Sequence, residues 1–162
     1  MDKMDKMDKT TFMNTLQETR AQWEELLAQV EEERMLQPGA TGKWSVKDVI
    51  AHVMSGEREM VPIMHTHVVA GSELWNLSDD ERNEIVYQQN RERPLQEILS
   101  EEQQAYADLL AAAQTLSDDD LNDPHHFQHM PEEWVPWQLF AGDSFKHYQD
   151  HMPALRAWVT HS

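Results

Sequence analysis

Apolar residues recur at intervals of three and four in four long stretches of this chain, and this spacing constrains the fold more than any other feature. The interval matches the turn of an α-helix, in which residues i, i+3 and i+4 share one face. The stretches cover residues 11–36, 45–70, 94–116 and 134–160. No run alternates apolar and polar residues between Asn-Gly or Asp-Gly turns, the pattern typical of a β-hairpin. The sequence therefore predicts an all-α protein.

Local signals separate the predicted helices. Residues 37–42 hold a proline and two glycines, which end the first helix. Ser45 is suited to cap the second helix, and Pro62 should bend it. Pro94 suits the first turn of the third helix, and the Ser-Asp-Asp-Asp run at residues 117–120 ends that helix. Four amphipathic helices with a longer crossover between the second and the third predict a four-helix bundle.

The length of 162 residues fits one domain. We assign residues 11–162 to this domain, and residues 1–10, which contain the Met-Asp-Lys unit three times, to a flexible N-terminal leader. The leader lacks the apolar core of a signal peptide. No apolar run approaches the roughly 18 residues that a membrane-spanning helix needs. We therefore expect a cytoplasmic protein.

The composition excludes several classes of function. With 13 basic and 30 acidic residues the formal net charge is −17, which argues against binding to nucleic acid or to an anionic membrane. Cysteine is absent, so disulfides, thiol nucleophiles and thiolate metal sites are excluded. Bundles with apolar outer faces commonly form homodimers, and the sequence does not decide between a monomer and a homodimer.

Two histidines lie in the apolar stripe of the last stretch. On a continuous helix, His147 and His151 fall within roughly 20° of Phe140. The i, i+4 spacing places both imidazoles on one side of the helix, close enough to share a metal ion. Imidazoles buried in a core need partners, and either a divalent cation or hydrogen-bonding groups can serve. His52, at the flank of the second helix's stripe, is the candidate for a third ligand.

The segments around these histidines resemble the DinB/YfiT-like family of four-helix-bundle metalloenzymes. Residues 42–53, Gly-Lys-Trp-Ser-Val-Lys-Asp-Val-Ile-Ala-His-Val, are similar to the family's Trp-Ser cap and its histidine-bearing second helix. Residues 142–153, Gly-Asp-Ser-Phe-Lys-His-Tyr-Gln-Asp-His-Met-Pro, resemble its closing His-x-x-x-His helix. Residues 74–94 and 116–121 resemble its crossover and its acidic break, so the resemblance extends over roughly residues 11–160.

The resemblance implies a divalent metal, commonly zinc or nickel, bound by His52, His147 and His151. It also implies an enzyme that acts on a small molecule, by hydrolysis or by transfer to a low-molecular-weight thiol, in detoxification or stress. Members of the family differ in activity, so the resemblance does not choose between these reactions. A non-enzymatic bundle that binds a metal or sequesters a small molecule is the alternative. In a third, purely structural interpretation the histidines are hydrogen-bonded and metal-free.

Three carboxylates are candidates for supporting roles. Asp48 lies one turn before His52, and Asp143 lies one turn before His147. Either carboxylate can accept the free ring N–H of its histidine and fix the tautomer, or stay solvated on the helix surface. Glu59, two turns after His52, is a candidate general base, although an ordinary surface role is the simpler interpretation.

Two further groups of polar residues fit alternative roles. One group follows a helical spacing on the crossover and can either face the metal or hold the crossover in place: Asn83, Tyr87 and Asn90. The other group lies in the loop after the third helix and can form a second metal site or stay exposed: His125, His126 and His129.

Overall fold

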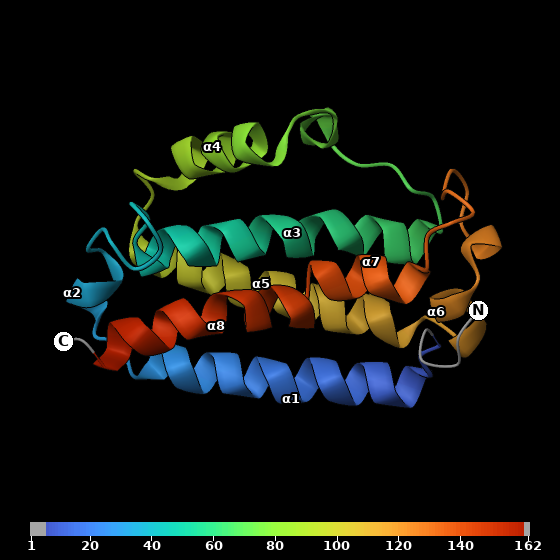
Figure 1. Ribbon diagram of the computed structural model, residues 1–162, viewed down its shortest axis with the longest axis horizontal. Coiled ribbons are helices and arrows are strands. Elements are labelled where there is room, and N and C mark those ends of the chain that lie inside the picture. Colours follow the sequence, from blue (N-terminus) through green and yellow to red (C-terminus); the bar gives the residue numbers. More distant parts are fainter. Residues whose placement is uncertain (1–5, 161–162) are drawn as a thin grey trace.

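Four helical rods form the framework of the protein in a computed structural model that describes residues 6–160 (Figure 1). The rods are α1 (Lys9–Ala28), α3 (Val46–Thr66), α5 (Leu95–Gln114) and a fourth that consists of α7 (Pro136–Gly142) and α8 (Phe145–Thr160). Helix α3 packs along α5, and α1 packs along α8. Pairing of β type in the described residues is limited to two isolated bridges. The predicted all-α bundle is confirmed.

Shorter helices connect the rods: α2 (Glu32–Met35), the 3-10 helix η2 (Glu73–Asn76), α4 (Asp79–Asn90), α6 (Asp118–Asn122) and the 3-10 helix η3 (Pro124–His126). The crossover from α3 to α5 contains η2 and α4. Helix α4 lies outside the four rods and runs along the outer side of α3 (Figure 1). The longer crossover between the second and third long helices is therefore present, and it leaves room for a cavity between α3 and α4.

The helix starts follow local capping chemistry. Ser45 precedes α3, where its hydroxyl accepts the N–H of Asp48 and the Asp48 carboxylate accepts the N–H of Ser45. This capping box satisfies two backbone donors at the helix start. Ser117 and Asp120 form the same arrangement at α6, and Ser78 caps α4 through its hydroxyl. These starts lie where the sequence places serine.

Several predicted boundaries are wrong. The first helix ends at Ala28 instead of continuing to residue 36, because Glu31 has an extended backbone and caps the separate helix α2. Helix α3 ends at Thr66 instead of residue 70, because the next residue, His67, adopts the left-handed conformation with φ of 58°. The fourth rod is interrupted, since Asp143 and Ser144 lie between α7 and α8.

The predicted leader is too long at its C-terminal end. Lys9 is already the first residue of α1, and Asp8 caps the helix by accepting the N–H of Thr11. The side chain of Asn122 forms hydrogen bonds with both the N–H and the carbonyl of Met7. Residues 1–5 of the predicted leader lie outside the described residues.

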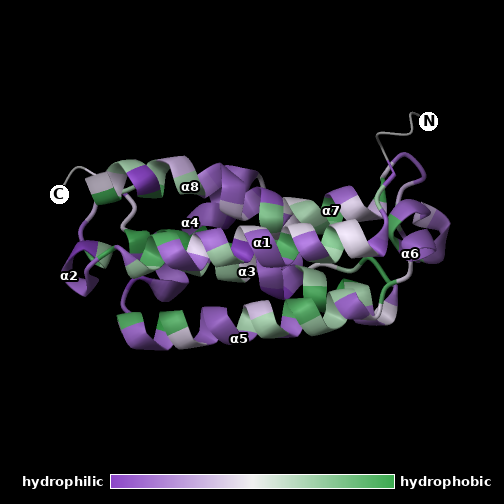
Figure 2. Ribbon diagram, turned by 90° about the horizontal axis from the view of Figure 1, so that it is seen from below, coloured by the Kyte–Doolittle hydropathy of each residue, from purple (hydrophilic) through white to green (hydrophobic). Residues whose placement is uncertain are grey.

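The core is rich in aromatic side chains and lies between the four rods. Trp23 and Tyr148 are stacked with ring centroids 5.4 Å apart, and Phe12 meets Phe145 edge to face at 5.3 Å. Both pairs join α1 to α8. In Figure 2, hydrophilic and hydrophobic residues alternate along each long helix, as expected of amphipathic helices. None of the described helices is long and apolar enough to cross a membrane.

Candidate metal centre and its cavity

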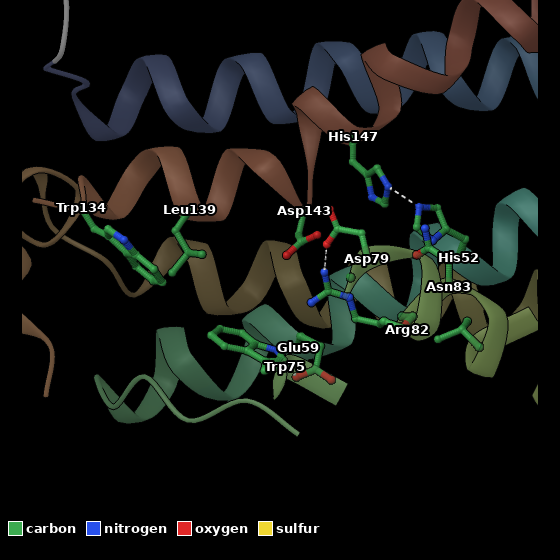
Figure 3. Close-up of a pocket in the computed structure, with 13 residues that line it drawn as sticks. His52, Glu59, Trp75, Asp79, Arg82, Asn83, Trp134, Leu139, Asp143 and His147 are labelled. Atoms are coloured by element: carbon green, nitrogen blue, oxygen red, sulfur yellow. Dashed lines mark hydrogen bonds and ion pairs between the residues drawn. The ribbon is translucent and has the colours of Figure 1, made fainter. Parts of the chain in front are cut away.

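Three histidines from two helices meet at one point inside the bundle. His52 lies in the second turn of α3, whereas His147 and His151 lie one turn apart on α8. One ligand atom from each lies within 4.8 Å of the others, and within residues 6–160 no other such group of three potential ligands exists. Nε2 of His147 is 2.8 Å from Nε2 of His52 (Figure 3). The structure thus brings together the three residues that the sequence predicts as ligands.

The three imidazoles are held in the neutral form. Burial, together with the neighbouring His151 and Arg82, lowers the pKa of His52 to about 4. Burial, together with His52 and His151, lowers the pKa of His147 to about 3. Burial also lowers the pKa of His151, against the opposing effect of Asp150. Each ring therefore presents one unprotonated nitrogen at neutral pH, as a metal ligand must.

The donor set fits a divalent metal ion. A proton shared between the two Nε2 atoms can satisfy His52 and His147 in part, but the buried Nδ1 of His147 has no hydrogen-bond partner in the described chain. Buried polar atoms without partners cost free energy. Three neutral imidazoles, with no thiolate or carboxylate among them, form a ligand set that proteins use for zinc, and imidazole also suits nickel and copper. These three residues can hold such an ion.

A cavity of about 440 Å³ adjoins the histidines. Its walls come from α3, η2, α4 and the α7–α8 rod, and His52 and His147 both line it. Trp75 and Trp134 supply aromatic walls, and Arg82 contributes a guanidinium group (Figure 3). The histidine cluster is therefore accessible to a small molecule from this side.

The structure gives Glu59 an anchoring role. Its carboxylate accepts hydrogen bonds from the Ser72 hydroxyl at 2.7 Å, the Ser72 N–H at 3.3 Å and the indole N–H of Trp75 at 3.0 Å. Both oxygens therefore hold the start of the crossover against α3. The general-base hypothesis is not supported by this geometry, because the basic lone pairs of the carboxylate are occupied by protein donors.

Neither aspartate accepts a ring N–H from its histidine in the described contacts. Asp48 is engaged in the capping box at Ser45. Asp143 lines the cavity, but Nδ1 of His147 has no partner and its Nε2 meets His52. The prediction for Asp143 assumed a continuous helix, whereas the break after α7 turns this residue toward α3. Burial raises the pKa of Asp143 to about 6, although Arg82 opposes the shift.

The crossover residues divide between the two predicted roles. Asn83 lines the cavity. Tyr87 stacks on Trp44 with centroids 6.5 Å apart, and Trp44 in turn contacts the ring of His52 at 5.2 Å. Asn90 donates to the carbonyl of Val86 and holds the end of α4. Only Asn83 therefore faces the candidate site, and Tyr87 supports His52 through Trp44.

The loop histidines bind carboxylates near α6. His126 Nδ1 lies 2.8 Å from Asp120, and His125 lies 3.0 Å from Asp123. These hydrogen bonds raise the pKa of both histidines. His129 has a positive φ of 67° and is exposed. The three rings do not form a metal-ligand cluster in the described residues.

A buried polar network at the centre of the bundle was not predicted. Arg20 on α1 forms two hydrogen bonds with Glu102 on α5, at 2.6 and 2.8 Å. Tyr148 on α8 donates to Glu57 on α3 at 2.6 Å. A signal was present in the sequence, since Glu57 occupies a position of the apolar stripe of α3, four residues after Val53.

The comparisons with known proteins agree with this fold. The family model of the DinB superfamily matches residues 15–152, and the chain therefore belongs to the DinB superfamily. The crystal structure of an uncharacterised protein from Escherichia coli UTI89 is similar, with a TM-score of 0.75 and 13% sequence identity. The match covers 95% of this chain and 94% of that one, and at this identity it shows the fold alone. No curated protein matches the chain.

Proposed function

We propose that His52, His147 and His151 bind one divalent ion, zinc or nickel, and that the protein is a cytoplasmic metal-dependent enzyme. Its substrate is a small molecule bound in the adjoining cavity, and its reaction is hydrolysis or transfer to a low-molecular-weight thiol, with a role in detoxification. The observation that carries the proposal is the convergence of three half-buried, neutral imidazoles on one point beside a cavity of about 440 Å³.

Such an ion supplies Lewis-acid chemistry, which lowers the pKa of a water or thiol bound to it. The chain's own residues supply position and environment. Trp44 packs against the ring of His52 and limits its rotation. Trp75 and Trp134 form walls that keep part of a bound molecule away from water. Arg82 and Asp143 place charged groups beside the two histidines that line the cavity.

Metal analysis of tag-free protein tests the first half of the proposal. After reconstitution with zinc or nickel and removal of excess ion, we expect one equivalent by elemental analysis. His147→Ala should reduce this to below about a tenth of an equivalent, because losing one of three ligands weakens binding by orders of magnitude. His125→Ala, on the exposed loop, is the matched control and should retain the metal. A wild-type protein that binds no stoichiometric metal contradicts the proposal.

Turnover tests the second half. Metal-loaded and metal-stripped protein are screened against esters, amides and strained or electrophilic small molecules, with and without an added thiol. We expect product only with the loaded protein, and a requirement for thiol separates transfer from hydrolysis. Tight one-to-one binding without product would instead support the sequestering alternative.

A further inference from the structure

Gly56 lies in the interior of α3, where alanine is the more favourable residue. A Cβ atom added at this position would lie 2.7 Å from Oδ1 of Asp143 and 3.2 Å from its Cγ. The first distance is shorter than real Cβ contacts allow, so a side chain at residue 56 would displace the Asp143 carboxylate. The glycine therefore explains how this carboxylate reaches the wall of the cavity.

The break in the fourth rod aims Asp143 at the same place. Asp143 ends α7 with a non-helical backbone, and α8 begins two residues later. The buried hydroxyl of Ser144 donates to the carbonyl of Phe140 at 2.7 Å and stabilises the end of α7. In Figure 3 the Asp143 carboxylate lies beside the carboxylate of Asp79, which is paired with Arg82.

The charged groups of the cavity leave Asp143 available to a ligand. Three carboxylates, from Glu59, Asp79 and Asp143, line it together with one guanidinium group, from Arg82. Glu59 is engaged by Ser72 and Trp75, and Arg82 forms an ion pair with Asp79. Asp143 has no hydrogen bond or ion pair in the part of the chain that the structure describes, and Arg82 acts on it only through its charge.

The aromatic walls favour the same kind of ligand. The indole rings of Trp75 and Trp134 border the cavity, and indole faces attract cations. The net charge of −17 favours the approach of cations over anions. A carboxylate without a partner, in a cavity that indole rings also border, is suited to a protonated amine.

We propose that Asp143, in the space that Gly56 leaves, binds the ammonium group of the cavity ligand and so makes the site selective for amine-bearing small molecules. The inference rests on the proposed function, because the ligand's other end is expected at the histidines. Asp143 is then a specificity-determining residue, and Gly56 acts through it. The rival is a ligand carboxylate bound by Arg82, and it predicts the opposite preference.

Cobalt-substituted protein tests this selectivity through its visible absorption. The probes are three thiols that differ in their tails: cysteamine with an ammonium group, 2-mercaptoethanol with a hydroxyl, and 3-mercaptopropionate with a carboxylate. We expect Asp143→Asn to reduce the affinity of cysteamine relative to 2-mercaptoethanol about tenfold, the effect of losing one charge-assisted hydrogen bond. Gly56→Ala should act in the same direction. Comparing ratios between variants cancels differences in thiol acidity.

Asp108→Asn removes the same charge from the exposed face of α5 and should leave the ratio as in the wild type. If the affinity ratio of cysteamine to 2-mercaptoethanol is unchanged in Asp143→Asn, the inference is overturned. It is also overturned if the wild type binds 3-mercaptopropionate most tightly of the three thiols and Arg82→Gln loses that binding. Loss of cobalt from Asp143→Asn also overturns it, because the residue would then act on the metal site. Failure of the wild type to bind cobalt at all would instead contradict the proposed function. Circular dichroism checks the fold of Gly56→Ala. If Gly56→Ala is unfolded, the result for Asp143→Asn alone decides the inference.

Discussion

Tyr148 and Glu57 form a hydrogen bond of 2.6 Å at a place where both residues have no exposed surface. Replacing Tyr148 with Phe keeps the ring stacked on Trp23 but removes the donor. Oε1 of Glu57 already lacks a partner, so without the tyrosine hydroxyl the carboxyl group would keep only the contact of Oε2 with Arg20 at 3.6 Å. We expect Tyr148→Phe to lower the free energy of unfolding by about 1–3 kcal/mol, measured by urea denaturation.

Tyr106→Phe is the matched control for this change. The Tyr106 ring lies 4.3 Å from the Arg20 guanidinium carbon, and phenylalanine preserves that ring. The side chain is half-buried, so we expect a change within about 0.5 kcal/mol. If both variants lose the same free energy of unfolding, the loss in Tyr148→Phe does not come from the Tyr148–Glu57 hydrogen bond.

Sequence patterns predict individual residues well when the pattern lies within one helix. The closeness of His147 and His151 is predictable, because residues at i and i+4 of a helix share one face whatever the surroundings. The orientation of Asp143 depends on a break between α7 and α8, and that break follows from tertiary packing as well as from local residues. The Asp48 carboxylate could either accept the ring N–H of His52 or accept the backbone N–H of Ser45. In the structure it forms the capping box with Ser45.

At the scale of elements, Glu59 anchors the start of the crossover. Glu59 holds Ser72 and Trp75 against α3, and through them the path from α3 to α4. We expect Glu59→Ala to speed amide hydrogen exchange in residues 72–78 while lowering the global free energy of unfolding by less than about 1 kcal/mol. The reason is that these hydrogen bonds lie near the surface and stabilise one local segment.

Glu73→Ala is the control for the crossover, because Glu73 is an exposed residue of η2. Its exchange profile should match the wild type. If Glu59→Ala also leaves exchange in residues 72–78 unchanged, the anchor is not Glu59, and packing of Trp75 alone must hold the segment.

Element boundaries could be predicted where one residue decides them. Ser45, Ser78 and Ser117 cap helices through their own hydroxyls, so their positions mark the starts of α3, α4 and α6. Helices α1 and α3 end earlier than the apolar spacing predicts, because that spacing continues into residues that contact the core from outside the helix. Periodicity reports burial, and burial does not require a continuous helix.

At the scale of the whole molecule, one polar network joins all four rods. Arg20 on α1 is paired with Glu102 on α5, and it lies 3.6 Å from Glu57 on α3, which is bonded to Tyr148 on α8. Two buried carboxyl groups thus share one buried guanidinium group. Glu102 holds the two-pronged hydrogen bonds with Arg20, which assigns the charge to Glu102 and the proton to Glu57.

This assignment sets the pH dependence of stability. Burial, with the nearby Glu102, raises the pKa of Glu57 well above its ordinary value, although Tyr148 and Arg20 act in the opposite direction. Between the ordinary pKa and the raised one, the folded state holds a proton that the unfolded state has lost. The contribution of Glu57 to stability is therefore complete below the ordinary pKa and is lost as the pH rises through the raised value. Each pH unit within this window costs up to about 1.4 kcal/mol.

Glu57→Gln cannot ionise and keeps an acceptor for the Tyr148 hydroxyl, so it isolates this effect from all other titrations. We expect its free energy of unfolding, relative to the wild type, to rise as the pH increases above the ordinary pKa of glutamate, measured by urea titrations at a series of pH values. Glu24→Gln is the control, because Glu24 also bonds to Arg20 but its side chain is more than half exposed. The free energy of unfolding of this variant, relative to the wild type, should lack the rise, since an exposed ion pair contributes little to stability. A difference for Glu57→Gln that falls with pH would mean that the folded protein holds Glu57 ionised. The buried network that joins the four rods would then carry two negative charges against one guanidinium group, a net negative charge where the assignment above gives a neutral pair.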